Sequence, residues 1–359
     1  MGTMTSGRPK NPDLSDANAA PVSATSEDAV LRALDQVRDL VVSGRRFVVS
    51  CHRRPDGDAL GSALGLTYVL RAVGKEAVLY HPERLPSTLQ FLGEIEAPET
   101  ELPTGEIDGV FVTDTATPTL LPEPWLETTA PLVVIDHHVA SVDFGDILLR
   151  DPDACSAGAV VLRIAERLGV SPLPSEAATP LYASMVADTG GFRYPNTTAD
   201  VLRAAADLVD AGAEPWPVAS NLFETWPRER MGLLSAVLAT LEVYEEGAVA
   251  TVRVTQKMMG DVGAEDDMVD GLVNYARHLD GVEIAALLWE RPADNGTRVT
   301  KVSLRSQGRY DVSAIAMALG GGGHRAAAAA ELPGTLDTIE ARILTEARRL
   351  IGSTSPAKE

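Results

Sequence analysis

The first half of the chain alternates short apolar runs with segments of helical hydrophobic spacing. The apolar runs cover 46–51, 77–80, 109–113 and 132–135 and are bounded by Pro, Gly or Asp. Helical spacing predicts helices over 58–73, 157–168, 176–187 and 199–211. Because strands that alternate with helices are typical of parallel sheets, we expect an α/β fold with both faces of the sheet covered.

The pattern changes after a segment at 215–227 that is rich in Pro and Trp. Strands are then predicted at 248–254, 284–289 and 299–304, and helices at 228–243, 267–278, 312–319 and 336–351. This predicts a second, smaller α/β domain. The expected organisation is a disordered tail over 1–28, a domain over 29–226, a connecting helix within 227–246 and a domain over 247–354. A cleft between two domains is a natural ligand site, so we expect the active site there.

Composition narrows the possible functions. The 359 residues include 31 Lys and Arg against 51 Asp and Glu, a formal net charge of −20. Such acidity excludes a protein that coats long nucleic acid through a basic face, but it permits a small anionic substrate held by local charges and metal ions. Two cysteines cannot form a disulfide framework, there is no long apolar stretch, and residues 1–28 lack the apolar segment of a signal peptide. We therefore expect a cytoplasmic protein without membrane attachment.

Acidic and histidine residues follow the ends of several predicted elements. They are His52, Asp56, Asp58, Asp114, Asp136, His137, His138 and Asp188. Taken singly, most have ordinary explanations: Asp58 could cap the next helix, Asp114 could form a turn, and Asp188 could be incidental at a helix end. Taken together, most of them fall at the carboxyl edge of the predicted sheet, where α/β proteins bind ligands. Clustered carboxylates repel one another unless a cation neutralises them, and carboxylates with imidazoles suit Mn²⁺, Co²⁺ or Mg²⁺. Two such metals can share a carboxylate and activate a water for attack on phosphorus.

The second half contains a run of four glycines, Gly320 to Gly323, followed by His324. A glycine run alone is more often a flexible turn. Here Arg305 and Ser306 accompany it, and glycine N–H groups with an arginine fork match the oxygens of a phosphate.

In this order the motifs resemble those of the DHH phosphoesterase superfamily, over about residues 30–352. The glycine run with His324, preceded by Ser303–Ser306, resembles the DHHA1 domain that accompanies the catalytic domain in bacterial oligoribonuclease/pAp-phosphatase proteins of the nano-RNase type. Two departures are visible: Ala328 stands where the family has Gly, and Leu319 where an aromatic residue is common. Both put the shape of the nucleotide pocket in doubt.

The resemblance implies a role for each residue. One Mn²⁺ would be bound by His52, Asp56 and Asp114, and the other by Asp58, Asp114, His137 and Asp188, so that Asp114 bridges them. His138 would contact the scissile phosphate as hydrogen-bond donor or acid, and Asp136 would orient a histidine. The residues implied to bind substrate are Arg305, Ser306, Gly322, Gly323 and His324, with Arg193, Asn196, Arg277 and Tyr275 as further candidates.

The resemblance also implies a function. The protein would be a Mn²⁺-dependent phosphodiesterase and phosphatase that converts cyclic di-AMP, pApA and very short RNA to mononucleotides, and pAp to AMP. The resemblance also implies a homodimer formed through the first domain. A RecJ-like exonuclease is disfavoured by the net charge and the lack of further nucleic-acid-binding domains, and a family II pyrophosphatase by the glycine-rich domain. A non-catalytic nucleotide sensor remains the alternative from another class, although a binding module has no need of so many convergent ligands.

Overall fold

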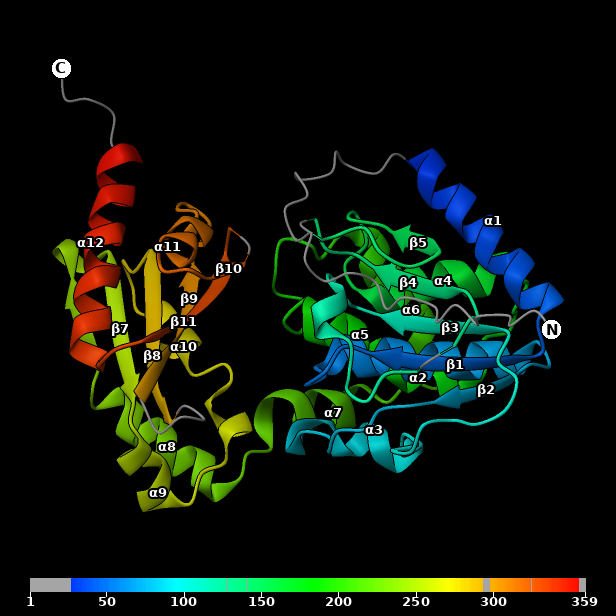
Figure 1. Cartoon of the computed structure of the whole chain (residues 1–359), viewed down its shortest axis with the longest axis horizontal. Helices are drawn as coiled ribbons and strands as arrows, with labels where there is room; N and C mark the ends of the chain where they lie inside the picture. Colours follow the sequence, from blue (N-terminus) through cyan, green and yellow to red (C-terminus); the bar gives the residue numbers. More distant parts are fainter. Residues whose placement is uncertain (1–26, 127, 140, 293–297, 324, 355–359) are drawn as a thin grey trace, which may run out of the picture. The chain divides into compact units, whose positions relative to one another are not determined.

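The computed structural model describes residues 27–126, 128–139, 141–292, 298–323 and 325–354. Most of the tail expected over 1–28 therefore lies outside the described residues. Its last two residues correct the prediction, because helix α1 (Glu27–Ser43) already begins there and buries one apolar stripe against the first domain. The described chain divides into two compact units between Thr225 and Trp226 (Figure 1).

The first unit contains a parallel sheet of five strands in the order β2-β1-β3-β4-β5. The strands are β1 (Arg46–Cys51), β2 (Glu76–Leu79), β3 (Gly109–Thr113), β4 (Leu132–Asp136) and β5 (Ile147–Arg150). Cys51 pairs with Thr113, which in turn pairs with Ile135, so β1, β3 and β4 end at the same level. The chain leaves β1 toward β2 but leaves β3 toward β4, and such a reversal of strand order opens a ligand crevice at the carboxyl edge of the sheet.

The two faces of this sheet are covered differently. One face packs Phe47, Val49 and Phe111 into the core formed with the helices, whereas the other packs Val48 and Val110 against the loop around Leu126. The expectation of two covered faces is correct, although a loop covers the second. The remaining helices of the unit are α2 (Gly57–Ala72), α3 (Gln90–Ile95), α4 (Ala157–Arg167), α5 (Ser175–Asp188), α6 (Ala199–Asp210) and α7 (Pro215–Ala219).

Glycines on α2 allow α5 to approach closely. They recur every fourth residue, at Gly57, Gly61 and Gly65. A methyl group on Gly57 would lie 2.7 Å from the Cβ of Ala187, and one on Gly61 would lie 2.5 Å from a backbone oxygen of α5, so neither position accommodates a side chain. Because Asp58 follows Gly57 and Asp188 follows Ala187, this contact brings two of the predicted metal ligands together.

The second unit contains a six-stranded sheet in the order β10-β11-β9-β8-β7-β6, antiparallel except between β7 and β8. Its strands are β6 (Glu242–Tyr244), β7 (Val249–Val254), β8 (Ile284–Pro292), β9 (Arg298–Ser306), β10 (Gly322–Gly323) and β11 (Ala327–Pro333). Helices α11 (Val312–Ala318) and α12 (Leu336–Thr354) cover one face, and α8 (Arg228–Leu238), α9 (Gln256–Val262) and α10 (Val273–Arg277) the other.

Two predicted helices of this unit differ from the structure. The connecting helix expected over 228–243 ends at Leu238, because the Thr240 hydroxyl donates to the Val237 carbonyl and accepts the Arg253 N–H, which starts the pairing of β6 with β7. The helix expected over 267–278 is interrupted at Gly271, whose φ of 80° lies in the left-handed region that favours glycine.

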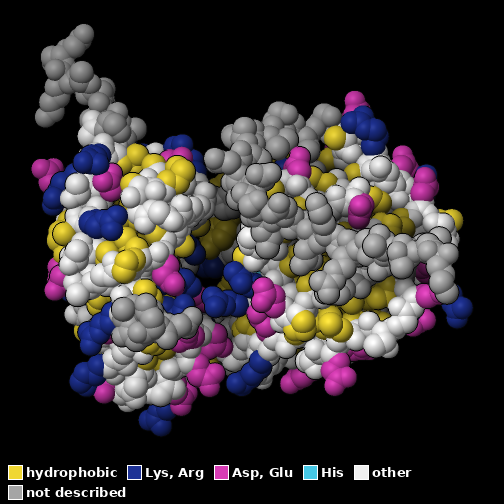
Figure 2. Space-filling view, viewed as in Figure 1, with side chains coloured by type: hydrophobic (Ala, Val, Ile, Leu, Met, Phe, Trp, Pro, Cys, Tyr) yellow, Lys and Arg dark blue, Asp and Glu magenta, His cyan; other side chains and the backbone are white. Residues whose placement is uncertain are grey.

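The surface of each unit mixes both signs of charge. Acidic side chains are spread among basic ones over the face shown in Figure 2. Among the described helices, none combines the length and the apolar character that crossing a membrane requires.

Candidate metal centre

Each predicted ligand comes from the end of a strand or helix. His52 follows β1, Asp114 follows β3, and Asp188 is the last residue of α5. Asp56 caps α2, because its Oδ1 accepts the N–H groups of Asp58 and Ala59 at 3.0 Å. The capping role that we considered for Asp58 therefore belongs to Asp56, and the Asp58 carboxylate, in the first turn of α2, is left for other contacts.

Asp114 occupies the centre of the site in an unusual backbone conformation. Its φ is 52°, and its N–H donates to the Ile135 carbonyl at 2.8 Å, which anchors the turn after β3 to β4. Aspartate tolerates this left-handed region better than most residues, but the conformation still has to be imposed by the surrounding structure. The side chain is only 4 % exposed. The strained turn thus buries a carboxylate at the edge of the sheet.

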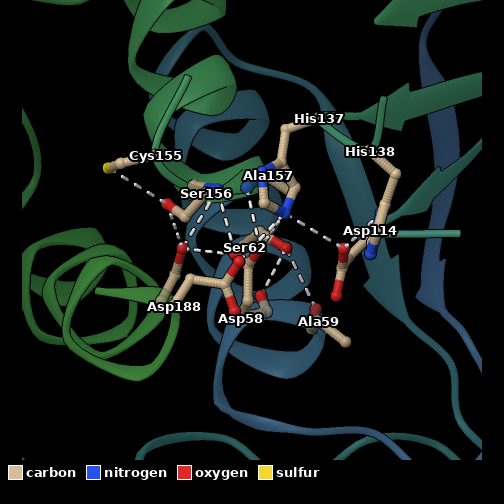
Figure 3. A network of polar contacts seen from close by, with 12 residues as sticks. Asp58, Ala59, Ser62, Asp114, His137, His138, Cys155, Ser156, Ala157 and Asp188 are labelled. Atoms are coloured by element: carbon tan, nitrogen blue, oxygen red, sulfur yellow. Dashed lines mark hydrogen bonds and ion pairs between the residues drawn. The ribbon is translucent and has the colours of Figure 1, made fainter. Parts of the chain in front are cut away.

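Two groups of ligands share Asp114. In the first, His52 Nε2 lies 3.4 Å from Asp114 Oδ2 and 4.0 Å from Asp56 Oδ1. In the second, His137 Nε2 lies 3.0 Å from Asp188 Oδ2, 3.3 Å from Asp58 Oδ2 and 3.6 Å from Asp114 Oδ1. Figure 3 shows His137 among the carboxylates of Asp58, Asp114 and Asp188.

These atoms are close enough to serve as ligands of a metal ion. The candidate ligand atoms lie within 4.8 Å of one another in each of three sets: Asp114 with His52 and Asp56, Asp58 with His137 and Asp188, and Asp114 with His137 and His138. The division of these ligands between two ions, with Asp114 common to both, stays a prediction.

Asp136 orients His138. Its Oδ1 accepts the backbone N–H groups of His137 at 2.9 Å and His138 at 3.2 Å, and lies 2.8 Å from His138 Nδ1. Burial lowers the pKa of His138, but the hydrogen bond with Asp136 and the charge of Asp114 outweigh it and raise the pKa. The contact at Nδ1 therefore fixes the orientation of the His138 ring.

The electrostatics of the cluster fit a bound cation. Burial and the charge of Asp58 raise the pKa of Asp114 to about 6 and that of Asp188 to about 7. Burial lowers the pKa of His137, but the nearby carboxylates of Asp188 and Asp58 raise it to about 12. Among the residues that the structure describes, the buried Asp114 Oδ1 and His137 Nε2 have no hydrogen-bond partner of suitable geometry. A cation between these atoms would satisfy both and relieve the repulsion between carboxylates.

Comparisons with known proteins identify the family of the chain. Residues 46–185 match the DHH family, N-terminal domain, and residues 246–352 match the DHHA1 domain. The bifunctional oligoribonuclease and PAP phosphatase NrnA of Thermus thermophilus is 35% identical over 304 residues, which cover 84% of this chain and 88% of that protein. The chain belongs to the DHH family.

Other relatives are more distant. The bifunctional oligoribonuclease and PAP phosphatase NrnA of Bacillus subtilis is 29% identical over 288 residues. The match covers 80% of this DHH protein and 89% of the Bacillus subtilis protein. The cyclic-di-AMP phosphodiesterase PdeA of Listeria monocytogenes is 26% identical over 317 residues, and the match spans 82% of this chain but only 46% of PdeA. The crystal structure of an exopolyphosphatase-related protein from Bacteroides fragilis has a TM-score of 0.77 at 24% identity, covering 89% and 98% of the two chains, and so shares the fold.

The candidate substrate residues of the DHHA1 domain lie on neighbouring strands. Gly323 on β10 pairs with Ala328 on β11, and Arg305 on β9 pairs with Ala327, which brings the glycines and the arginine to the same part of the sheet. Ser306 is buried, and its Oγ accepts the Gly308 N–H at 2.9 Å. Its contact with substrate stays a prediction, as does that of Gly322.

Two further substrate candidates are His324 and Arg193. His324 lies outside the described residues. Arg193 belongs to the first unit and follows the glycines after α5, where its Nε donates to the Gly190 carbonyl and its guanidinium stands 5.7 Å from the centre of the Phe223 ring. Arg193 is therefore placed on the loop that begins at Asp188.

The structure explains the two departures from the family pattern. A methyl group on Gly323 would lie 2.8 Å from the Cβ of Ala328, so the alanine fits because its partner across β10 and β11 is glycine. Ala328 and Leu319 are both buried in the core between the sheet and α11 and α12. Both residues therefore affect the shape of the domain through packing in its core, not through contacts at its surface.

Sequence reasoning missed two polar residues that contact the candidate metal ligands. The buried His81 places its Nε2 3.2 Å from the carbonyl oxygen of His52, and the buried Ser184 contacts the carboxylate of Asp58. The only signal of Ser184 in the sequence is a hydroxyl within a helix that is otherwise buried and largely apolar. That pattern alone does not say which residue the hydroxyl meets.

Proposed function

We propose that the protein is a Mn²⁺-dependent phosphoric ester hydrolase for short nucleotides. Its substrates would be cyclic di-AMP, pApA and very short RNA, which it converts to mononucleotides, and pAp, which it converts to AMP. The observation that carries the proposal is the convergence of two ligand groups on the buried Asp114. The similarity to an oligoribonuclease and PAP phosphatase of Thermus thermophilus and to a cyclic-di-AMP phosphodiesterase of Listeria monocytogenes supports short nucleotides as the class of substrate.

The first group, His52 and Asp56 with Asp114, would hold one cation. The second group, Asp58, His137 and Asp188 with Asp114, would hold the other. When bound, two divalent cations supply an activated water and neutralise charge on the phosphate. We propose Mn²⁺ for both positions, with Co²⁺ or Mg²⁺ as possible substitutes, because the ligands are carboxylates and imidazoles without thiolates.

His138 would act on the phosphate rather than on a metal. Asp136 holds Nδ1 of the ring at 2.8 Å, and the ring so oriented would donate a hydrogen bond to a phosphate oxygen or a proton to the leaving oxygen. Asp136 is itself buried and held by two backbone N–H groups, so it fixes the ring rather than exchanging the proton.

The DHHA1 domain would bind the rest of the substrate. Arg305 would contact a phosphate with its forked guanidinium, and the N–H groups of Gly322 and Gly323 would approach the phosphate closely. Ser306, His324 and, from the first domain, Arg193 complete the proposed set.

The proposal is tested with purified protein and Mn²⁺. Cyclic di-AMP, pApA, a short RNA and pAp are incubated separately, and the products are resolved by chromatography. We expect AMP from the adenylate substrates and mononucleotides from the RNA, with a long RNA hydrolysed far more slowly. Binding of these nucleotides without any product would contradict the enzyme and favour the non-catalytic sensor.

We also propose a cytoplasmic homodimer that assembles through the first domain. The dimer follows from the family resemblance, and the location from the use of cysteine, because two cysteines cannot form a disulfide framework. Sedimentation velocity of the purified protein tests the dimer, and fractionation of the producing cell tests the location.

A further inference from the structure

Ser184 is fully buried in α5 beside the metal centre. Its hydroxyl donates to Asp58 Oδ1 at 2.6 Å, a short distance typical of a hydrogen bond to a carboxylate. The Ser184 Oγ accepts the N–H of Gly158 at 3.0 Å and also lies 3.0 Å from the Oγ of Ser156. The hydroxyl is therefore held from several sides and points at one metal ligand.

The N-terminus of α4 anchors the same carboxylate. The N–H of Ala157 donates to Asp58 Oδ2 at 2.8 Å, and that of Gly158 donates to Oδ1 at 3.3 Å. Helix N-termini favour negative charge, because their first N–H groups have no partner within the helix. Figure 3 shows Asp58 below Ser156 and Ala157. Both oxygens of Asp58 are thus fixed by groups far from it in sequence.

These hydrogen bonds fix which lone pair of Asp58 Oδ2 points toward the ligand group of His137. Oδ2 lies 3.3 Å from His137 Nε2, and a carboxylate oxygen has two acceptor positions, of which the Ala157 N–H takes one. The other is left for a cation. Rotation about the last side-chain bond of aspartate has a broad energy minimum, so without the bond to Oδ1 this direction would be poorly defined.

The neighbouring helices pack closely against Ser184. A methyl group on Gly158 would lie 2.1 Å from Ser184 Oγ, and one on Gly61 would lie 3.2 Å from Ser184 Cβ. Glycines on α2 and α4 therefore allow α5 to bring the serine within reach of Asp58.

We propose that Ser184 is a positioning residue for metal binding, whose hydroxyl, with the N–H groups of Ala157 and Gly158, holds Asp58 so that Oδ2 faces the ligand group of His137. The inference rests on the metal site of the proposed function. It assigns to a side chain that touches neither metal nor substrate a share of the affinity for the cation.

The test compares three variants by calorimetric titration of chelator-stripped protein with Mn²⁺. Ser184→Ala should weaken Mn²⁺ binding about 10- to 100-fold, as loss of a hydrogen-bond partner of a metal ligand does. Ser184→Cys, which keeps a weak donor, should lie between this variant and the wild type. The matched control is Ser62→Ala, because the buried Ser62 hydroxyl donates to the backbone oxygen of Asp58 and not to its carboxylate.

Ser62→Ala should keep the wild-type affinity, and thermal unfolding of the metal-free variants shows whether each is folded. Excess Mn²⁺ should restore the kcat of Ser184→Ala. Wild-type affinity in Ser184→Ala, or an equal loss in Ser62→Ala, would overturn the role of Ser184. If Ser184→Ala does not fold, the test uses Ser184→Cys, and a wild-type affinity for Mn²⁺ in that variant would overturn the role of Ser184. A wild-type protein that binds no Mn²⁺ would refute the metal site itself, which separates the two failures.

Discussion

Asp114 combines three properties that are rarely found in one residue. Its backbone is left-handed, its side chain is buried, and its two oxygens face different ligand groups. For most residues the left-handed conformation costs roughly 1–2 kcal/mol, whereas aspartate and asparagine adopt it more readily. The choice of residue at this position is thus limited by the backbone as well as by the chemistry.

The first prediction separates these two limits. Asp114→Asn and Asp114→Ala should both lower kcat/KM for all four substrates by more than about 100-fold, because each removes the ligand common to both groups. Only Asp114→Ala should also lower the temperature of unfolding through backbone strain, which calorimetry of the metal-free proteins measures. A wild-type rate in Asp114→Asn would show that the metal assignment is wrong.

A second prediction concerns His138, whose position allows it either to bind a metal ion or to donate a hydrogen bond or proton to the phosphate. His138→Gln should lower kcat about 100- to 10,000-fold, the range for loss of a general acid, and leave the number of bound Mn²⁺ ions unchanged. Metal analysis of the purified variant decides the point. Loss of one ion would instead assign His138 to the group that it forms with Asp114 and His137.

Among the elements, the contact between α2 and α5 sets the geometry of the second ligand group. Asp58 and Asp188 belong to different helices, and the separation of their carboxylates follows from how closely the two helices pack. Helix glycines with nothing packed against them make no such contribution. The two kinds of glycine can be compared directly.

The third prediction uses this difference. Gly61→Ala should destabilise the protein by about 1–3 kcal/mol and weaken Mn²⁺ binding, because the new methyl group meets the backbone of α5 at 2.5 Å and forces the helices apart. The control is Gly260→Ala on α9, where nothing lies within 4 Å and alanine should stabilise the helix by up to about 1 kcal/mol. Chemical denaturation and Mn²⁺ titration measure both. Equal behaviour of the two variants would contradict a spacing role for α2.

The elements also show how far sequence alone could reach. The ends of β1, β3 and β4 were predicted to within a residue, and with them the edge of the sheet that gathers His52, Asp114 and Asp136. Parallel strands are apolar runs with polar residues directly after them, so the sequence marks both the strand and the site. The sequence could not give β11, whose alanines have little strand propensity, nor the contact of Ser184 with Asp58, which depends on helix packing.

At the scale of the whole molecule, the metal ions would link folding, charge and pH. Part of the net charge of −20 belongs to the carboxylates of the centre, where a bound cation reverses the local sign. On the face shown in Figure 2, acidic side chains are spread among basic ones. An anionic substrate can therefore approach the centre although the protein is acidic as a whole.

The fourth prediction follows from competition between protons and metal. The hydrogen bond to Asp114 outweighs burial and raises the pKa of His52 to about 9, and that of His137 is raised to about 12, so both rings are protonated at neutral pH without metal and must lose the proton to bind it. The rise in unfolding temperature caused by Mn²⁺ should therefore grow from about pH 6 to about pH 8. Differential scanning calorimetry with and without chelator measures it, and a rise independent of pH would exclude histidine ligands.

The fifth prediction tests whether both domains serve one reaction. Arg305→Ala should raise KM for pApA about 10-fold, the loss of one charged hydrogen bond, while Mn²⁺ affinity stays at the wild-type value. Arg309→Ala, which removes an exposed arginine of the same domain, is the control. An unchanged KM in Arg305→Ala would place the substrate on the first domain alone.

The glycines of α2 have a consequence for protein engineering. Each glycine inside a helix costs up to about 1 kcal/mol relative to alanine, so Gly57, Gly61 and Gly65 would rank high in any scheme that stabilises proteins by replacing helix glycines. On this helix such a scheme would fail for two reasons, since the added methyl groups meet α5 and would displace the carboxylates proposed to hold the cations. A thermostable variant should be sought instead at open positions such as Gly260.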